Sequence, residues 1–159
     1  MVREFQEHDH EHCISDAMAS AEARCAERSA RFTPVRRRVL EILLEEHRAL
    51  GAYDILERLR AEGFGSQPPV AYRALDFLVS HGRAHRIERL NAFVACTHGD
   101  ADHVPAFLIC GSCDAVAEPS SDQAIGAISN AASKAGFQVD RVAVEVQGTC
   151  EACAEKLND

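Results

Sequence analysis

Apolar residues recur every three to four positions through much of the first 82 residues, which predicts a series of amphipathic helices. The clearest helix spans residues 31–47. Thr33 is a favourable N-cap, and Pro34 suits the first helical position. One apolar stripe follows at Val35, Val39, Ile42 and Leu43.

Three further helices are predicted in this half of the chain. Residues 15–29 are rich in alanine, and residues 53–63 repeat the amphipathic pattern up to Gly63. Residues 67–82 form the third, which Pro69 can open and Gly82 can end. Its apolar positions are Val70, Leu75, Leu78 and Val79.

The pattern changes to short β-like runs at residues 84–90 and 92–96, with Asn91 at the turn between them. Helices followed by a small hairpin predict a winged helix-turn-helix domain. The third helix of the motif, residues 67–82, should then lie in the DNA major groove.

Residues after 104 predict a small α+β module. Strands are expected at 106–110 and 115–118, a helix at 121–136, a long alternating strand at 137–148 and a short helix at 151–158. We expect a small antiparallel sheet. The fold class is therefore α+β, with an N-terminal winged helix-turn-helix domain followed by a small α/β domain.

The predicted organisation has four parts. Residues 1–30 form an acidic, histidine-containing tail and a first helix, and residues 31–96 form the winged-helix domain. Residues 97–104 are a polar hinge, and residues 105–159 are the small α/β domain. The segment His8–Cys13 is expected to be disordered, with a metal-chelating tail as the alternative.

Charge supports this division. The 159-residue chain has a net charge of −8, yet residues 31–95 hold 11 Lys/Arg against 8 Asp/Glu, a net charge of +3. A basic domain within an acidic protein is typical of DNA binding. The chain has no apolar run of about 18 residues, and its polar N-terminus does not resemble a signal peptide. We expect a cytoplasmic protein without a membrane partner.

Seven cysteines in a reducing compartment favour metal ligation over disulfides. Two C-x-x-C pairs stand 36 residues apart: Cys110 with Cys113, and Cys150 with Cys153. Four thiolates make a closed tetrahedral zinc site, which is structural because no coordination position stays open. Thiol redox chemistry is the alternative for these pairs.

A second candidate set spans the predicted hinge: His85, Cys96, His103 and Glu118. One thiolate, two imidazoles and a carboxylate suit zinc, and the soft thiolate disfavours magnesium, calcium and manganese. Each residue also has a simpler interpretation, as a surface histidine or a core cysteine.

Several residues are candidates for DNA binding. Tyr72 and Arg73 lie in the first half of the predicted recognition helix, where Arg73 could contact guanine. Arg36, Arg37 and Arg38 could contact phosphates. The alternatives are that Tyr72 belongs to the core and that the arginine run is a solvated helix face.

Read together, these motifs closely resemble the ferric uptake regulator family, and within it the zinc uptake regulator branch. The resemblance covers about residues 30–155. It rests on P-x-V-x-YRAL at 68–75, H-R-x-E at 85–88, H-x6-CGSC-x4-E at 103–118, and CEAC at 150–153.

The resemblance implies a homodimeric, metal-activated repressor of zinc-uptake genes that binds a pseudo-palindromic duplex operator. The four paired cysteines match the family's structural zinc site, which implies that residues 105–159 are a zinc-stapled dimerisation domain. The mixed His/Cys/Glu set matches the regulatory site of the zinc branch, which gives two Zn²⁺ per monomer. Tyr53 matches a position close to DNA.

Iron-sensing members carry a dense histidine run at the hinge, whereas CTHGDADH here is poor in histidine and contains Cys96. This departure favours zinc. It also puts a third metal site in doubt, because only His98, Asp100 and Asp102 remain there. The alternative is a sibling regulator that senses iron, nickel, manganese or peroxide.

A zinc-dependent or thiol enzyme is the alternative from a different class. The deaminase pattern of H-x-E followed by P-C-x-x-C is absent, and Ile109 rather than proline precedes Cys110. The motif CGSC does not open a predicted helix, as a thiol oxidoreductase requires. We therefore expect neither an enzyme nor a small-molecule substrate.

Overall fold

The structure is a computed structural model that describes residues 10–46, 48–65, 67–96, 98 and 103–157. The chain divides into two compact units, one spanning residues 6–101 and the other containing residues 102–159. This division falls inside the predicted hinge. None of the helices in the described ranges has the length and apolar character needed to cross a bilayer.

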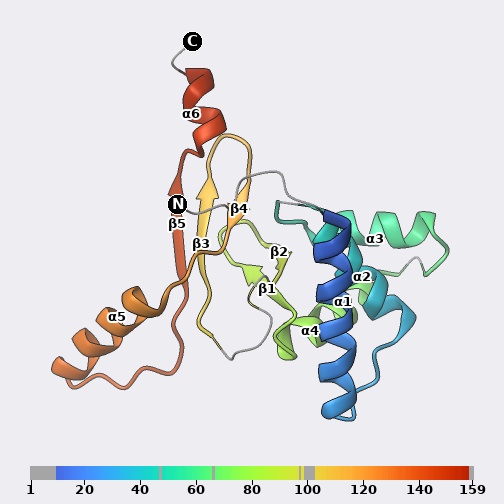
Figure 1. Cartoon of the computed structure of the whole chain (residues 1–159), viewed down its shortest axis with the longest axis horizontal. Coiled ribbons are helices and arrows are strands. Elements are labelled where there is room, and N and C mark those ends of the chain that lie inside the picture. The colour runs from blue at the N-terminus through green and yellow to red at the C-terminus, as the bar shows by residue number, and fades with distance from the viewer. Residues whose placement is uncertain (1–9, 47, 66, 97, 99–102, 158–159) are drawn as a thin grey trace. The chain divides into compact units, whose positions relative to one another are not determined.

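The N-terminal unit contains four helices and a two-stranded antiparallel wing, which confirms the predicted winged helix-turn-helix (Figure 1). Its elements are α1 (His10–Glu27), α2 (Pro34–Glu45), α3 (Ala52–Ala61), α4 (Pro68–Ser80), β1 (Ala84–Ile87) and β2 (Ala92–Ala95).

Local chemistry sets several element boundaries as predicted. The Oγ1 of Thr33 accepts a hydrogen bond from the backbone N–H of Arg36 at 3.4 Å and caps α2. Gly63 and Gly82 follow α3 and α4 with φ of 81° and 67°, a left-handed conformation that suits glycine. Asn91 adopts φ of 46° in the wing turn.

The core of this unit lies between the four helices and the wing. Leu43, Ile55, Leu75 and Leu78 are each no more than 2 % exposed. One apolar position of α4 does not reach the core, since Val79 is 38 % exposed. Ala71 and Ala74 are buried on this helix together with the leucines, on the side of α4 that packs against α2 and α3.

The first helix is longer than predicted. It begins at His10 rather than residue 15, so the expectation that His10–Cys13 is disordered is wrong. Ile14, Met18 and Ala21 form a stripe that packs on the core of the unit. This tertiary contact stabilises a helix whose N-terminal turn has little apolar pattern of its own.

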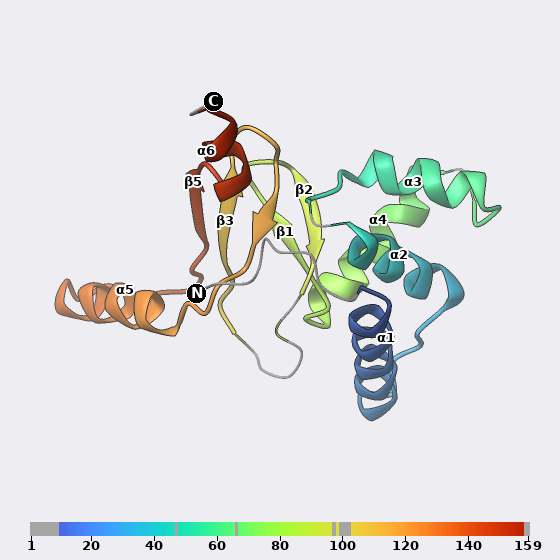
Figure 2. The same cartoon turned by 45° about the horizontal axis from the view of Figure 1, so that its top comes forward.

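The C-terminal unit is built on a three-stranded sheet of order β4-β3-β5 (Figure 2). Its elements are β3 (Ala106–Cys110), β4 (Val116–Ala117), α5 (Asp122–Lys134), β5 (Val144–Gly148) and α6 (Glu151–Leu157). In both views α5 projects from one end of the sheet.

Two sequence predictions fail in this sheet. The strands β3 and β5 are parallel, whereas we predicted a purely antiparallel sheet. The reason is that the connection between β4 and β5 contains α5 and returns the chain to the end of the sheet where β3 begins, so β5 starts beside the first residue of β3. The predicted strand at 137–148 is also shorter, because Val144 pairs with Ala106, the first residue of β3, and no strand among the described residues pairs with the segment before Val144.

Candidate functional site

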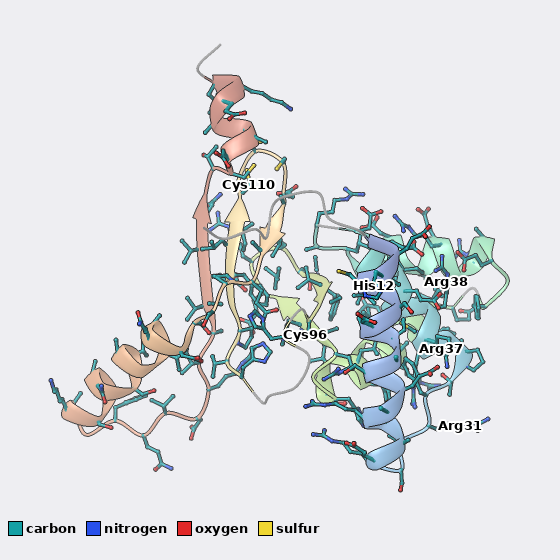
Figure 3. All side chains as sticks on the ribbon, in the orientation of Figure 1. His12, Arg31, Arg37, Arg38, Cys96 and Cys110 are labelled. Carbon is teal, nitrogen blue, oxygen red and sulfur yellow. The ribbon has the colours of Figure 1, made fainter. Side chains whose placement is uncertain are left out.

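Four cysteines meet where β3 and β5 end. Cys110 is the last residue of β3 and pairs in register with Gly148, so Cys150 follows just beyond on the neighbouring strand. Cys113 lies in the turn after β3, and Cys153 lies on α6. The four Sγ atoms all lie within 4.8 Å of one another, at the end of the sheet where Figure 3 labels Cys110.

Backbone hydrogen bonds hold the two C-x-x-C turns in place. The N–H of Gly111 donates to the carbonyl of Gly148 at 2.9 Å, and the N–H of Asp114 donates to that of Cys110 at 3.0 Å. A Cβ at Gly111 would lie 2.9 Å from Nε2 of Gln147, so a larger residue here would displace the end of the Gln147 side chain. The turns therefore present sulfur atoms on one side.

Protonation differs within this cysteine cluster. The backbone N–H of Cys150 stabilises the Cys110 thiolate and lowers the pKa of Cys110 to about 6. The neighbouring Cys150 side chain instead raises the pKa of Cys153 to about 12. Several thiolates at such spacing repel one another unless a cation is shared between them.

The donor set fits zinc. Tetrahedral ligands at ~2.3 Å from Zn²⁺ stand about 3.8 Å apart, and Sγ of Cys113 lies 3.8 Å from Sγ of Cys150. This set contains only thiols, as a closed structural site does.

The wing brings the first two residues of the mixed set together. His85 lies on β1, and Cys96 directly follows β2, the antiparallel partner of β1. The N–H of Cys96 donates to the carbonyl of Arg83 at 2.9 Å, which continues the ladder by one residue. The ligand atoms of His85 and Cys96 lie within 4.8 Å of each other.

The C-terminal unit brings the other two residues together. Nε2 of His103 lies 2.5 Å from Oε1 of Glu118, which directly follows β4 and is 5 % exposed. The Oγ of Ser121 donates to the carbonyl of Val104 at 2.7 Å and holds these two segments side by side. The four predicted ligands therefore form two pairs, one in each unit.

The proposed base-reading residues are accessible. Tyr72 is 42 % exposed on the first half of α4, so the alternative that it belongs to the core is wrong. Arg73 beside it is also exposed. Tyr53, in the first turn of α3, is 67 % exposed. A large aromatic side chain in water at this position suits contact with a partner.

The arginine run on α2 is more constrained than predicted. Arg36 lies over the ring of Phe77, with its guanidinium carbon 3.7 Å from the ring centroid. Arg37 forms an ion pair with Glu22. Both side chains keep part of their surface in solvent.

Arg38 differs from these two. Its guanidinium binds Glu62 through Nε at 2.6 Å, and Nη1 binds Glu41 and Glu45 at 3.1 and 2.8 Å. Figure 3 labels it on α2 beside Arg37. Three carboxylates surround this cation, and its phosphate contact stays a prediction. We assign Arg38 to packing of α2 against α3.

Other candidates lie at the margins of the described residues. His98 is described, whereas Asp100 and Asp102 of the hinge lie outside the described residues, as do His8 and Asp9 of the N-terminal tail.

Sequence reasoning missed Arg83, which is buried at the base of the wing. The pattern of apolar residues could not have predicted this burial, because Arg83 is a single charged residue between a helix and a strand.

Comparisons with known proteins agree with this architecture. The sequence model described as "Ferric uptake regulator family" matches residues 27–147. The "Zinc uptake regulation protein" of Escherichia coli strain K12 is 38% identical over 141 residues, which is 88% of this chain and 82% of the relative.

Solved structures show the same similarity. The chain resembles "Zinc Uptake Regulator Complexed With Zinc AND DNA" with a TM-score of 0.86 and 35% identity, over 92% of this chain and 98% of that one. It also resembles holo XcZur with a TM-score of 0.79 and 37% identity, over 87% and 96% of the two chains.

Proposed function

The chain belongs to the ferric uptake regulator family, and on that premise we propose that it is a zinc-responsive transcriptional repressor of zinc-uptake genes. It binds double-stranded DNA as a homodimer in the cytoplasm and carries out no catalysis. The observation that carries this proposal is the combination of a winged helix with a thiolate-containing pair, His85 and Cys96, on the wing itself.

The proposed regulatory zinc ligands are His85, Cys96, His103 and Glu118. When bound, zinc would tie the wing pair to the pair in the C-terminal unit and so restrict how the units are presented to DNA. Shifting the protein from 1:99 to 99:1 in favour of the DNA-binding arrangement requires zinc to bind that arrangement more tightly by about 5.5 kcal/mol. Zinc binds sites with thiolate ligands with a free energy of about 10–16 kcal/mol, which is more than this shift requires.

The proposed structural zinc ligands are Cys110, Cys113, Cys150 and Cys153, which brings the total to two zinc ions per monomer. These residues join the ends of β3 and β5 and the start of α6. A unit of about 55 residues has too small a core to be stable without such a staple.

DNA contacts are assigned to the exposed face of α4 and to the residues around it. Arg73 makes the base contact, Tyr72 and Tyr53 pack against the duplex, and Arg36 and Arg37 bind phosphates. A homodimer that presents two such faces binds a pseudo-palindromic operator.

The C-terminal unit supplies the dimer contact. Several of its large apolar side chains are exposed. Ile128 on α5 is 42 % exposed, Val146 on β5 is 49 % exposed, and Phe137 is 67 % exposed. A second copy of the chain would cover this surface.

The deciding experiment measures DNA binding under each metal. The purified protein is first used to select duplexes from a random pool, and the selected duplex is then titrated with zinc, iron(II), nickel or manganese at buffered free concentrations. We expect DNA binding to increase at a lower free concentration of zinc than of iron(II), nickel or manganese. A response led by iron, nickel or manganese, or loss of binding with peroxide, would identify a sibling sensor instead.

A further inference from the structure

Arg83 is a buried cation at the base of the wing, and only 6 % of its surface is exposed. Arginine is seldom buried unless partners compensate for the loss of hydration. The residue stands between Gly82, which follows α4, and Ala84, which begins β1. It therefore occupies the junction between the proposed recognition helix and the strand that carries His85.

The backbone of Arg83 joins two functional elements. Its N–H donates to the carbonyl of Leu78 at 2.8 Å, which secures the C-terminal turn of α4. Its carbonyl accepts the N–H of Cys96 at 2.9 Å. Two hydrogen bonds of one residue thus connect the end of α4 to the cysteine of the proposed regulatory site.

The side chain of Arg83 reaches a third element. Its Nη1 donates to Oγ of Ser20 on α1 at 3.4 Å. Burial raises the pKa of the Cys25 thiol on α1, and the positive charge of nearby Arg83 opposes this increase. The guanidinium therefore lies beneath α1, and it anchors the backbone of Arg83 to that helix.

We propose that Arg83 is a positioning residue that couples the His85–Cys96 metal pair to α4 and α1. The inference rests on the proposed function. Zinc held by Cys96 would restrain the Cys96 backbone, whose N–H is already bound by the carbonyl of Arg83. Because its guanidinium is bound to α1, Arg83 cannot shift to relieve this restraint. The restraint therefore passes through the Arg83 N–H to the carbonyl of Leu78 and so to α4.

The test compares Arg83→Met and Ser20→Ala with the control Arg28→Met, which removes an exposed arginine just after α1. The full-length protein is prepared with one zinc per monomer and with two, and its affinity for the selected duplex is measured in both forms. The ratio of the two dissociation constants is the coupling between zinc and DNA.

We expect Arg83→Met to reduce this ratio at least tenfold and Ser20→Ala to reduce it about threefold, with Arg28→Met unchanged. A residue that only stabilises the fold would weaken both forms equally and leave the ratio unchanged. An unchanged ratio in Arg83→Met overturns the proposal. If that variant does not fold, an unchanged ratio in Ser20→Ala overturns it.

Hydrogen exchange gives a readout without DNA. In the parent protein, the second zinc should slow exchange of the Arg83 and Cys96 amides, and this protection should be lost for Arg83 in the Ser20→Ala and Arg83→Met variants. If zinc protects the residue-83 amide equally in the parent and the variants, the coupling through Arg83 is overturned and the proposed function is not. A parent protein whose DNA affinity does not respond to zinc overturns the proposed function as well.

Discussion

Nε2 of His103 lies 2.5 Å from Oε1 of Glu118, inside the C-terminal unit. Two atoms with lone pairs at this distance share a proton or a cation. The imidazole and the buried carboxylate are the two ligands that the C-terminal unit contributes to the proposed regulatory site. The other two proposed ligands, His85 and Cys96, belong to the N-terminal unit.

Replacing Glu118 by glutamine should selectively weaken the second zinc. The amide keeps the size of the side chain but removes the negative charge that balances Zn²⁺. We expect at least a tenfold loss of affinity, since even residues that only support ligands contribute 10–100-fold. Competition with a coloured chelator measures this, and Asp140→Asn, an exposed carboxylate of the same unit, is the matched control. Equal affinity in both variants would remove Glu118 from the site.

The Cys96→Ala variant should remain a folded dimer that retains structural zinc but lose zinc-dependent DNA binding. The reason is that the thiolate is the only sulfur ligand in the proposed regulatory set. Zinc per monomer should fall from two to one in elemental analysis, and gel-shift titration should show no response to zinc. Cys13→Ala, an exposed cysteine on α1, is the control. Unchanged zinc-dependent binding would exclude Cys96 from the mechanism.

The Cys153→Ser variant should unfold much of the C-terminal unit, while α1 to α4 stay folded. Removing one thiolate opens the site that joins α6 to the ends of β3 and β5. Size-exclusion chromatography with light scattering should show a monomer, and circular dichroism should show retained helix. A strong chelator at low pH should reproduce this state in the parent protein. A stable dimer without this zinc would contradict the structural role.

Arg73→Ala and Arg36→Ala should weaken DNA binding in different ways. A bidentate contact to guanine is worth about 1–3 kcal/mol, so Arg73→Ala should cost roughly 5- to 150-fold and relax the base preference at one position. Arg36→Ala should weaken all sequences about equally and reduce the salt dependence by about one charge. Binding to the selected duplex and to single-base variants, at several salt concentrations, separates the two effects.

Arg38→Met should lower the melting temperature of the N-terminal unit by about a few degrees while leaving DNA affinity nearly unchanged. The Arg38 guanidinium lowers the pKa of Glu62, so this interaction contributes fully above the ordinary glutamate pKa and is lost as pH falls through the lowered value. The difference in melting temperature between parent and variant should therefore be present at pH 7 and shrink below about pH 4. A large loss of DNA affinity would restore Arg38 to the phosphate contacts.

The sequence determined the elements whose signals are local. Thr33 and Pro34 mark the start of α2, because capping and proline geometry depend only on neighbouring residues. Gly63, Gly82 and Asn91 mark turns for the same reason, since each tolerates a positive φ. The two C-x-x-C pairs predicted a metal cluster because a short turn is enough to align two thiols.

Tertiary structure decided what depends on distant partners. The direction of β5 follows from the path through α5, and its length follows from where β3 begins at Ala106. The extension of α1 to His10 depends on docking against the core, and the role of Arg38 depends on Glu62, 24 residues away. The junction at Arg83 brings α1, α4 and Cys96 together through contacts between residues up to 63 positions apart, which no pattern of neighbouring residues encodes.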